Sequence, residues 1–399
     1  MDRGSALRTF LGRARRACAL GTLSVIAVAT LAASAPAHTA GIAAQGAGMW
    51  RLLPQAPIGQ AGQGFTGVWT GSRMIVFGGV TNIDEQGIRI YAGAIYDPAT
   101  DSWSSLPDLR TGNPYGYKTV WTGTELVAFS PLGSYAYNPR TNRWRRLPVE
   151  RKGGAGGVVV WTGREVIDWG GGCCAEASSG GGAYDPTTNR WRRLAPSPLA
   201  ASQGPIGAWT GRELIILVSG LDPSSGKPYP ASFARAAAYN PTTDTWRGIA
   251  PPPALRDRAT AVWDGHEVLL VGGAVIRQTP QPWPLTRSVL GYNPATNRWR
   301  RLAPLESGRV DCAVVWTGKR LLVWGGQAGT RRFSIQRPPR GFAYDPATNR
   351  WTKLPKAPLR GRVSPAAVWT GKTMIVWGGG GLPNYRSFTD GAAFTPATP

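Results

Sequence analysis

The stretch Trp316-Thr-Gly-Lys-Arg-Leu-Leu-Val-Trp-Gly-Gly326, followed by Tyr344-Asp-Pro-Ala-Thr-Asn-Arg-Trp351, decides the fold, because its pattern recurs along the whole chain. A Trp-x-Gly turn is followed by an apolar run, a Tyr-Asp/Asn-Pro turn and a closing Trp. The first element recurs at Trp69, Trp121, Trp161, Trp209, Trp263, Trp316 and Trp369. The second recurs at Tyr96, Tyr137, Tyr184, Tyr239, Tyr292 and Tyr344, with Phe394 in the seventh place. A unit of about fifty residues with four strand-like segments is typical of a propeller blade.

The seventh unit lacks its closing Trp, because the chain ends at Pro399, soon after Phe394. The missing element appears at the other end of the repeat region, at Trp50 in Met-Trp-Arg-Leu-Leu-Pro, which resembles Trp144-Arg-Arg-Leu-Pro. We therefore predict an all-β, seven-bladed propeller over residues 49–396, whose last blade takes residues 49–54 as its outer strand and so closes the ring. The predicted blades span 59–107, 113–148, 152–196, 201–251, 255–304, 308–355 and 361–396.

These repeats resemble the kelch-repeat family of galactose-oxidase-like propellers. The resemblance rests on glycine pairs followed by the spaced Tyr and Trp, at Gly78-Gly79, Gly272-Gly273, Gly325-Gly326 and Gly378-Gly379. Phe129-Ser130 and Ser219-Gly220 depart from it. The resemblance implies the fold, but kelch propellers include binding scaffolds, oxidases and sugar isomerases, so it does not select one function.

The N-terminus has the pattern of an export signal. Arg3, Arg8, Arg13, Arg15 and Arg16 precede an apolar run from Ala17 to Ala35, and Ala35-Pro36-Ala37 offers a small-x-small cleavage site. The alternative is an uncleaved anchor, since about 18 apolar residues can just span a bilayer. We expect residues 1–37 to be a signal peptide, 38–48 a short linker, and the protein to be secreted or associated with the cell envelope. No stable membrane insertion is expected after cleavage, because no later segment is long and apolar enough to cross a bilayer.

The chain is strongly basic, with a net charge of +23. Residues 1–37 contain five Arg and one Asp, so the remainder has 40 basic against 21 acidic groups, a net charge of +19. Many Arg flank the closing Trp in the predicted outer strand, where charge protects an unpaired sheet edge and guanidinium can stack on Trp. Attraction to anionic envelope polymers or lipid headgroups is the alternative. An exported protein without a nucleic-acid motif is not expected to bind nucleic acid.

The turns predict two different faces. We expect four strands, a to d, in each blade: strand a ends at Trp-Thr-Gly, b at the glycine pair, c at Tyr-Asp-Pro, and d carries the closing Trp. The Thr-Gly-x-x turn between a and b and the Asp/Asn-Pro-x-Thr-Asn/Asp turn between c and d are short in every blade, because Gly, Pro and Asp/Asn supply the turn conformations. Up-and-down strands place both turns on one face of the disc. The b-to-c connections vary greatly in length, and we expect a ligand site among these long loops, near the central channel.

The strongest candidates there are arginines. Arg256, Arg309 and Arg362 each lie seven residues before the Trp of strand a, so we expect them at equal height in blades five, six and seven. Arg258 and Asp311, five residues before their Trp, share the next level, where they could pair across blades. An arc of guanidinium groups suits a carboxylate, phosphate or sulfate. The alternative is that the repeat uses this Arg for structural hydrogen bonds.

Trp283 and the cysteines are further candidates. Trp283 stands outside the repeat positions in Thr279-Pro-Gln-Pro-Trp-Pro, where a rigid aromatic could stack on a sugar or anchor a partner, or could simply pack over its loop. Cys173 and Cys174 are adjacent and could form a vicinal disulfide in an oxidising compartment, with free thiols as the alternative. No spacing indicates a metal site.

Histidine usage argues against several chemistries. The chain has two histidines, His38 and His266, and His266 belongs to a short turn. Copper-radical oxidases of the kelch type require two histidine ligands, so this reaction is disfavoured, as are Ser-His-Asp and Cys-His catalysis. No cofactor is expected.

Two functions remain from the sequence. The first is a monomeric, secreted binding module whose long-loop face meets an extracellular glycan, an anionic envelope polymer or a protein. The second is a carbohydrate-directed enzyme, such as a sugar-acid isomerase, with its site at the channel mouth. We favour binding, because no catalytic constellation emerges.

Overall fold

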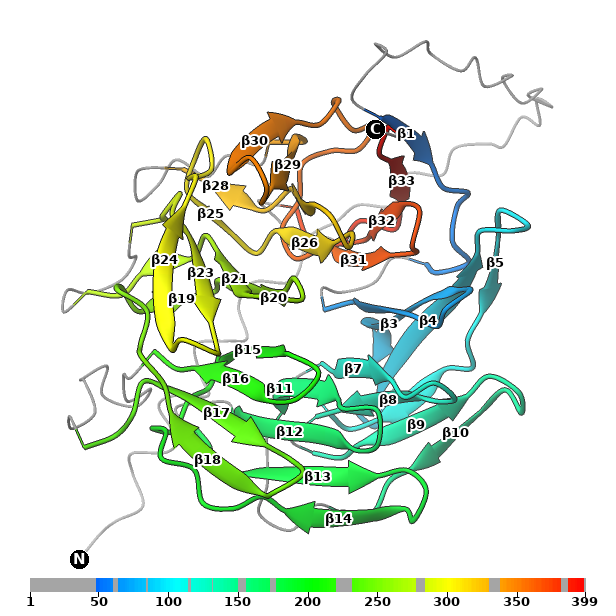
Figure 1. Cartoon of the computed structure of the whole chain (residues 1–399). Coiled ribbons are helices and arrows are strands. Elements are labelled where there is room, and N and C mark those ends of the chain that lie inside the picture. The colour runs from blue at the N-terminus through cyan, green and yellow to red at the C-terminus, as the bar shows by residue number, and fades with distance from the viewer. Residues whose placement is uncertain are drawn as a thin grey trace, which may run out of the picture. The chain divides into compact units, whose positions relative to one another are not determined.

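The computed structural model describes an all-β chain, shown in Figure 1. The described residues are 48–59, 64–83, 85–113, 116–130, 132–149, 156–172, 177–219, 232–277, 284–329, 338–381 and 387–397. These ranges contain no helix, and therefore no helix that is long and apolar enough to span a membrane. The predicted signal peptide (1–37) and most of the linker (38–47) lie outside the described residues.

Seven antiparallel sheets make up the propeller, each with four strands in up-and-down order, and the first has one additional strand. Blade one contains β2 (Thr66–Trp69), β3 (Met74–Ile83), β4 (Arg89–Asp97), β5 (Ser102–Ser105) and the additional β6 (Leu109–Thr111). Blade two contains β7 (Lys118–Trp121), β8 (Leu126–Phe129), β9 (Tyr135–Asn138) and β10 (Arg143–Arg146). Blade three contains β11 (Gly156–Trp161), β12 (Val166–Gly171), β13 (Gly181–Asp185) and β14 (Arg190–Arg193).

The later blades repeat this order. Blade four contains β15 (Ile206–Trp209), β16 (Leu214–Leu217), β17 (Ala236–Asn240) and β18 (Thr245–Gly248). Blade five contains β20 (Thr260–Trp263), β21 (Val268–Val271), β23 (Val289–Asn293) and β24 (Arg298–Leu302). Blade six contains β26 (Ala313–Trp316), β27 (Leu321–Trp324), β29 (Gly341–Asp345) and β30 (Arg350–Lys353). Blade seven contains β31 (Ala366–Trp369), β32 (Met374–Trp377), β33 (Gly391–Thr395) and β1 (Met49–Leu52).

Strand β1 is the outer strand of blade seven, although it comes from the other end of the repeat region. It pairs antiparallel with β33, with Trp50 opposite Phe394, and the two rings lie 5.1 Å apart. The innermost strands β2, β7, β11, β15, β20, β26 and β31 follow one another around the ring, and β31 lies against β2 (Figure 1).

Short ribbons extend blades five and six at the b-to-c end. The ribbon of blade five pairs β19 (Arg256–Asp257) with β22 (Ala274–Val275), and that of blade six pairs β25 (Arg309–Val310) with β28 (Gln327–Ala328). Blade seven has a single bridge at the same place, between Val363 and Gly380. Arg256 lies in the first ribbon, Arg309 in the second, and Arg362 directly before the bridge.

The turns have the chemistry that the sequence predicts. In the a-to-b turn of blade three, Thr162 Oγ1 accepts hydrogen bonds from the backbone N–H groups of Arg164 and Glu165, and Gly163 adopts a φ of 97°. In its c-to-d turn, Asp185 Oδ1 accepts from the N–H of Thr187. The residue that ends the c-to-d turn is left-handed in six blades: Asp101, Asn142, Asn189, Asp244, Asn297 and Asn349. Asp and Asn tolerate this conformation better than most side chains.

Each closing Trp joins two blades. Its indole N–H donates to a carbonyl just beyond the outer strand of the preceding blade, as in Trp246 to Ala195 at 2.9 Å. The other donors are Trp50, Trp103, Trp144, Trp191, Trp299 and Trp351, at 2.7–3.0 Å. The buried Tyr of strand c packs against the closing Trp of its own blade, with ring centroids 4.9 Å apart for Tyr239 and Trp246. The aromatic repeat therefore fixes both the blade core and the contact between blades.

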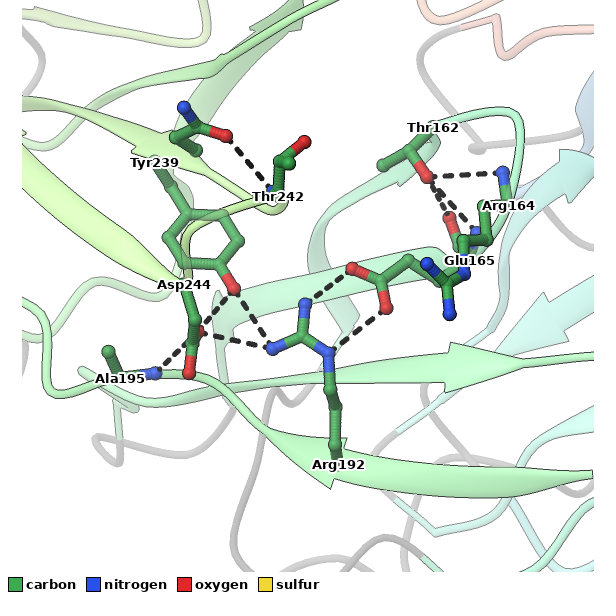
Figure 2. A network of polar contacts seen from close by, with 9 residues as sticks. Thr162, Arg164, Glu165, Arg192, Ala195, Tyr239, Thr242 and Asp244 are labelled. Atoms are coloured by element: carbon green, nitrogen blue, oxygen red, sulfur yellow. Dashed lines mark hydrogen bonds and ion pairs between the residues drawn. The ribbon is translucent and has the colours of Figure 1, made fainter. Parts of the chain in front are cut away.

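Arginine clasps form a second set of links between blades. Figure 2 shows Arg192, the residue after the closing Trp of blade three, which binds Glu165 of its own blade. The same guanidinium donates to Tyr239 OH and Asp244 Oδ1 of blade four, each at 3.1 Å. Arg145 binds Glu125, Tyr184 and Asn189 in the same way, and Arg51 of β1 binds Tyr96 and Asp101 of blade one.

The clasps revise the interpretation of the outer-strand arginines. We expected them to protect the sheet edge or to stack on Trp, but the arginine directly after the closing Trp instead makes ion pairs. Arg247 and Arg300 likewise bind Glu213 and Glu267. Edge protection remains a role for the arginine one residue further on, as in Arg193, which is exposed.

Candidate functional site

The three arginines expected to line the channel mouth are buried. Their exposed fractions are 5% for Arg256, 2% for Arg309 and 0% for Arg362. They do lie at equivalent places in blades five, six and seven, as the equal spacing predicted. Their guanidinium groups, however, are turned into the protein.

Each guanidinium binds the backbone at the ends of strands b and c. Arg309 Nη1 donates to the carbonyl of Gly325 at 2.8 Å and to that of Arg340 at 3.3 Å. Arg256 binds Gly272 and Ser288 in the same way, and Arg362 binds Gly378 and Asp390. Buried carbonyl groups require donors, and these side chains supply them. The geometry therefore favours the structural alternative for all three.

The glycine pairs explain why this Arg occurs beside them. Gly272 and Gly273 have φ values of 61° and 101°, and the N–H of Gly273 donates to the carbonyl of Arg309 in the next blade at 2.8 Å. A Cβ on Gly272 would lie 2.3 Å from the same carbonyl oxygen. Only glycine permits this approach, so the pair and the next blade's Arg form one structural unit. Burial lowers the pKa of Arg256 to about 10 and also lowers the pKa of Arg309.

Two residues after each of the buried arginines Arg256 and Arg309, the side chains are exposed or partly exposed. Arg258 and Asp311 form an ion pair across blades five and six, with Nη1 and Oδ2 2.9 Å apart, which confirms the pairing expected from their spacing. Arg258 Nε also lies 3.7 Å from Asp257 Oδ2. In blade seven the equivalent residue is Ser364, whose N–H donates to the Asp311 carbonyl. We call Asp257, Arg258, Asp311 and Ser364 the charged cluster.

Three members of the charged cluster have an unusual backbone. Arg258, Asp311 and Ser364 have φ values of 52°, 54° and 48°. At the same distance from the Trp of strand a, blades one and two have left-handed glycines, Gly64 and Gly116. A non-glycine residue in this conformation costs about 1–3 kcal/mol and often marks a functional position. Blades five to seven thus carry side chains at a position where glycine would be less strained.

The carboxylates of the charged cluster are partly desolvated. Burial raises the pKa of Asp257, against the opposing effect of Arg258. Burial likewise raises the pKa of Asp311, while Arg258 and Lys118 of blade two act to lower it. A cation and two carboxylates held on a fixed backbone can hydrogen-bond a polar surface that carries both charges.

The described cavities lie at the opposite end of the ring. One has a volume of about 890 Å³ and reaches from Thr70 and Arg73 in blade one to Asn189 in blade three. A second, of about 590 Å³, lies between blades three and four, between Arg164 and Arg212. Both are lined by short turns and by clasp residues, so they are not on the long-loop face where we expected a ligand site. Glu125 and Arg145 pair in the first cavity and Glu165 and Arg192 in the second, whereas Arg164, Arg190 and Arg212 line the second cavity without forming an ion pair among the described residues.

Other sequence candidates have different outcomes. Trp283, Cys173 and Cys174 lie outside the described residues, so their roles stay predictions. Cys312 lies partly buried just before β26, and burial raises the pKa of its thiol to about 11, which keeps it protonated at neutral pH. Within the described ranges, no group of three His, Cys, Asp or Glu side chains lies together as a metal site would require.

Sequence reasoning missed the clasp arginines, although a signal was present. Blades two to five have Glu at the end of the a-to-b turn and Arg directly after the closing Trp, as in Glu165 and Arg192. Blades one and six have Arg at the first place and Ser or Thr at the second, as in Arg73 and Ser104. Arg therefore never occupies both places of one blade, and blade seven has Thr373 at the first place and Arg51 at the second.

No family model matches this chain. It is 33% identical over 156 residues to the Kelch-like protein terF of Aspergillus terreus, a stretch that covers 38% of this chain and 33% of the relative. It is 26% identical over 233 residues to human Kelch-like protein 34, covering 55% of this chain and 33% of the relative. The matches thus span about a third of these relatives' lengths.

A solved structure supports the same fold. A fungal alcohol oxidase of the AA5 family, solved in complex with copper, aligns with a TM-score of 0.63 and 14% identity, over 88% of this chain and 76% of the oxidase chain. At this identity the likeness shows the fold alone. The structure is thus a seven-bladed propeller, and its sequence is similar to kelch-like proteins over part of their length.

Proposed function

We propose that this kelch propeller is an exported interaction module that binds its partner with the long-loop face. Kelch propellers generally mediate protein interactions. The observation that carries the proposal is the charged cluster, in which Arg258 and Asp311 occupy left-handed positions where other blades have glycine. Strain that packing does not require is explained if these side chains serve recognition.

The mixed charge of the cluster bears on the class of partner. An extracellular glycan, an anionic envelope polymer and a protein were all compatible with the sequence. Asp257 and Asp311 would repel a polyanion, whereas complementary positive and negative groups are typical of protein surfaces that fit together. We therefore propose a protein partner for this face.

The enzyme alternative loses support from the same geometry. A sugar-acid isomerase would have used Arg256, Arg309 and Arg362 to hold the substrate carboxylate. These side chains donate to backbone carbonyls and are buried, so they present no clamp to solvent.

Binding to an array of the exported proteins and glycans of the source cell tests the proposal. Loss of one charged hydrogen bond costs about 1.5–3 kcal/mol, so Arg258→Ala should weaken binding roughly tenfold or more. The matched control is Arg301→Ala, which removes an exposed arginine from the outer strand of blade five. A partner bound equally by both variants would show that the charged cluster is not the contact.

A charge swap separates recognition from stability. The double variant Arg258→Asp/Asp311→Arg retains an ion pair between the blades, so its melting temperature should stay near that of the parent. Its binding should nevertheless remain weak, because each charge now meets the wrong side of the partner. Recovery of binding in the swap would assign the pair a structural role only.

Export itself has a direct test. N-terminal sequencing of the protein from its source cell should find a start near His38, beyond Ala35-Pro36-Ala37. A native product that begins at Met1 or Asp2 would contradict cleavage and favour the anchor alternative.

A further inference from the structure

The short-turn face, defined by the a-to-b and c-to-d turns, carries a ring of exposed cations. The first variable residue of the Thr-Gly-x-x turn is basic in four blades: Arg164, Arg212, Lys319 and Lys372. All four are exposed, and blade five has His266 at the same place. We call these four residues the inner basic ring, because the a-to-b turns follow the innermost strands around the propeller.

The turns hold the inner basic ring in one fixed arrangement. In each turn the Thr hydroxyl accepts a hydrogen bond from the N–H of the basic residue, at 3.3 Å for Arg164, 3.4 Å for Arg212, 3.2 Å for Lys319 and 3.3 Å for Lys372. Figure 2 shows this contact for Thr162 and Arg164. Because strands a to d follow one another up and down in every blade, all of these turns lie at the same end of the disc. The four cations therefore share one level.

A second set of cations surrounds the first. Each member is the first residue of an outer strand, directly after the c-to-d turn, and all are exposed: Arg143, Arg190, Arg298 and Arg350. The c-to-d turns open on the same face as the a-to-b turns. We call these residues the outer basic ring. Together the two rings spread positive charge from the centre of the face to its edge.

Most carboxylates of this face have other partners, although Asp185 and Asp345 are the cross-strand neighbours of Arg190 and Arg350. Glu125, Glu165, Glu213 and Glu267 bind the clasp arginines. Asp185 and Asp345 accept backbone N–H groups within their turns. Among the described residues, no member of either ring lies within ion-pair distance of a carboxylate.

We propose that the short-turn face docks on a membrane surface that carries anionic lipid headgroups. The two rings spread their basic residues over blades two to seven of one face, around the two cavities, which suits many separate phosphates better than a single extended strand of polymer. Each basic residue near an anionic bilayer contributes about 1 kcal/mol, so several together give stable but salt-dependent binding. This docking uses the opposite face from the charged cluster and does not depend on the partner bound there.

Vesicle sedimentation tests the docking with the full chain, so that the apolar N-terminal segment contributes equally in every sample. The ring variant carries Arg164→Glu, Arg212→Glu, Lys319→Glu and Lys372→Glu. The matched control carries Arg146→Glu, Arg193→Glu, Arg301→Glu and Lys356→Glu, which are exposed residues at the other end of the outer strands. Both variants change the net charge equally.

The readout is the part of binding that depends on phosphatidylglycerol in phosphatidylcholine vesicles. The ring variant should lose about a hundredfold or more of it, and the control should stay within about threefold of the parent. Equal losses in both variants, or no loss in either, would overturn the proposal. Polyphosphate that binds the parent more tightly than vesicles of equal phosphate content would assign the face to a soluble polyanion instead. Thermal melts of all three proteins verify that each is folded.

Discussion

The indole N–H of Trp50 donates to the carbonyl of Pro355 across 3.0 Å, although 305 residues separate them. An equivalent hydrogen bond joins each of the remaining pairs of adjacent blades, for example from Trp351 to Ala303. Trp103 of blade one in turn donates to Pro54, just beyond β1. The N-terminal strand is thus bonded to blade six on one side and to blade one on the other, as other outer strands are bonded to their two neighbouring blades.

Removal of residues 1–57 should therefore destabilise the whole propeller. The deletion exposes the edge of β33 and removes the packing of Trp50 on Phe394, and the loss of one well-packed aromatic side chain alone costs roughly 3–5 kcal/mol. Thermal unfolding should show a large fall in melting temperature. Removal of residues 1–47, which leaves β1 intact, is the control, and equal melting of the two truncations would contradict the role of β1.

Arg309→Ala should unfold the protein more readily. The change removes the donor of the buried Gly325 carbonyl and of the partly buried Arg340 carbonyl, and leaving a buried acceptor without a partner costs about 1–3 kcal/mol. Urea unfolding should show a loss of roughly 3 kcal/mol, with a smaller loss for Arg309→Lys, which retains one donor. The exposed control Arg301→Ala should shift stability by no more than about 0.5 kcal/mol. A stable Arg309→Ala protein would return this side chain to the candidates for ligand binding.

Blade one lacks a clasp, and two substitutions should build one. Ser104 occupies the place of the clasp arginine, Arg73 the place of its glutamate, and Tyr137 and Asn142 of blade two already form the acceptor pair. Ser104→Arg with Arg73→Glu creates a partly exposed pair worth about 1 kcal/mol but removes the exposed ion pair of Arg73 with Asp97, so the net rise in the free energy of unfolding should be below that value. Ser104→Arg alone should give no gain, because it places two guanidinium groups together. An equal gain from the single change would show that the glutamate is unnecessary.

The clasp of blade four predicts a pH dependence. The hydrogen bond from Arg247 is the main cause of a lowered pKa at Glu213, whose ordinary value is 4.5. A carboxylate with a lower pKa in the folded state stabilises the protein above its unfolded pKa, and this contribution disappears as the pH falls through the folded value. Glu213→Gln should therefore reduce stability at neutral pH, by no more than about 1 kcal/mol because Arg247 is 39% exposed. The difference from the parent should vanish in acid, and a difference that does not change with pH would contradict the ionic contribution.

Particular residues show which features of the structure could be predicted from the sequence. Turn residues such as Asn189, with its left-handed backbone, and closing residues such as Trp246 act through local chemistry, so their spacing predicts strands and turns directly. The spacing of Arg258 and Asp311 from their Trp predicted their pairing, because equal offsets in equal blades lie at equal heights. The long-loop candidates Trp283, Cys173 and Cys174 depend on loops that follow no repeat, so no such rule applies to them.

By itself the sequence determined the all-β propeller, its seven repeats and the short uniform turns, because each of these depends on a local pattern of glycine, proline, aromatic and apolar residues. The tertiary structure alone decided which arginines face solvent. The sequence led us to expect Arg309 at the channel mouth and Arg192 at a sheet edge, but the first is buried against the carbonyls of Gly325 and Arg340, and the second joins Glu165 to Asp244 of the next blade. The environment of a long charged side chain is set by strands that are distant in the sequence, and these come together only when the blades pack around the ring.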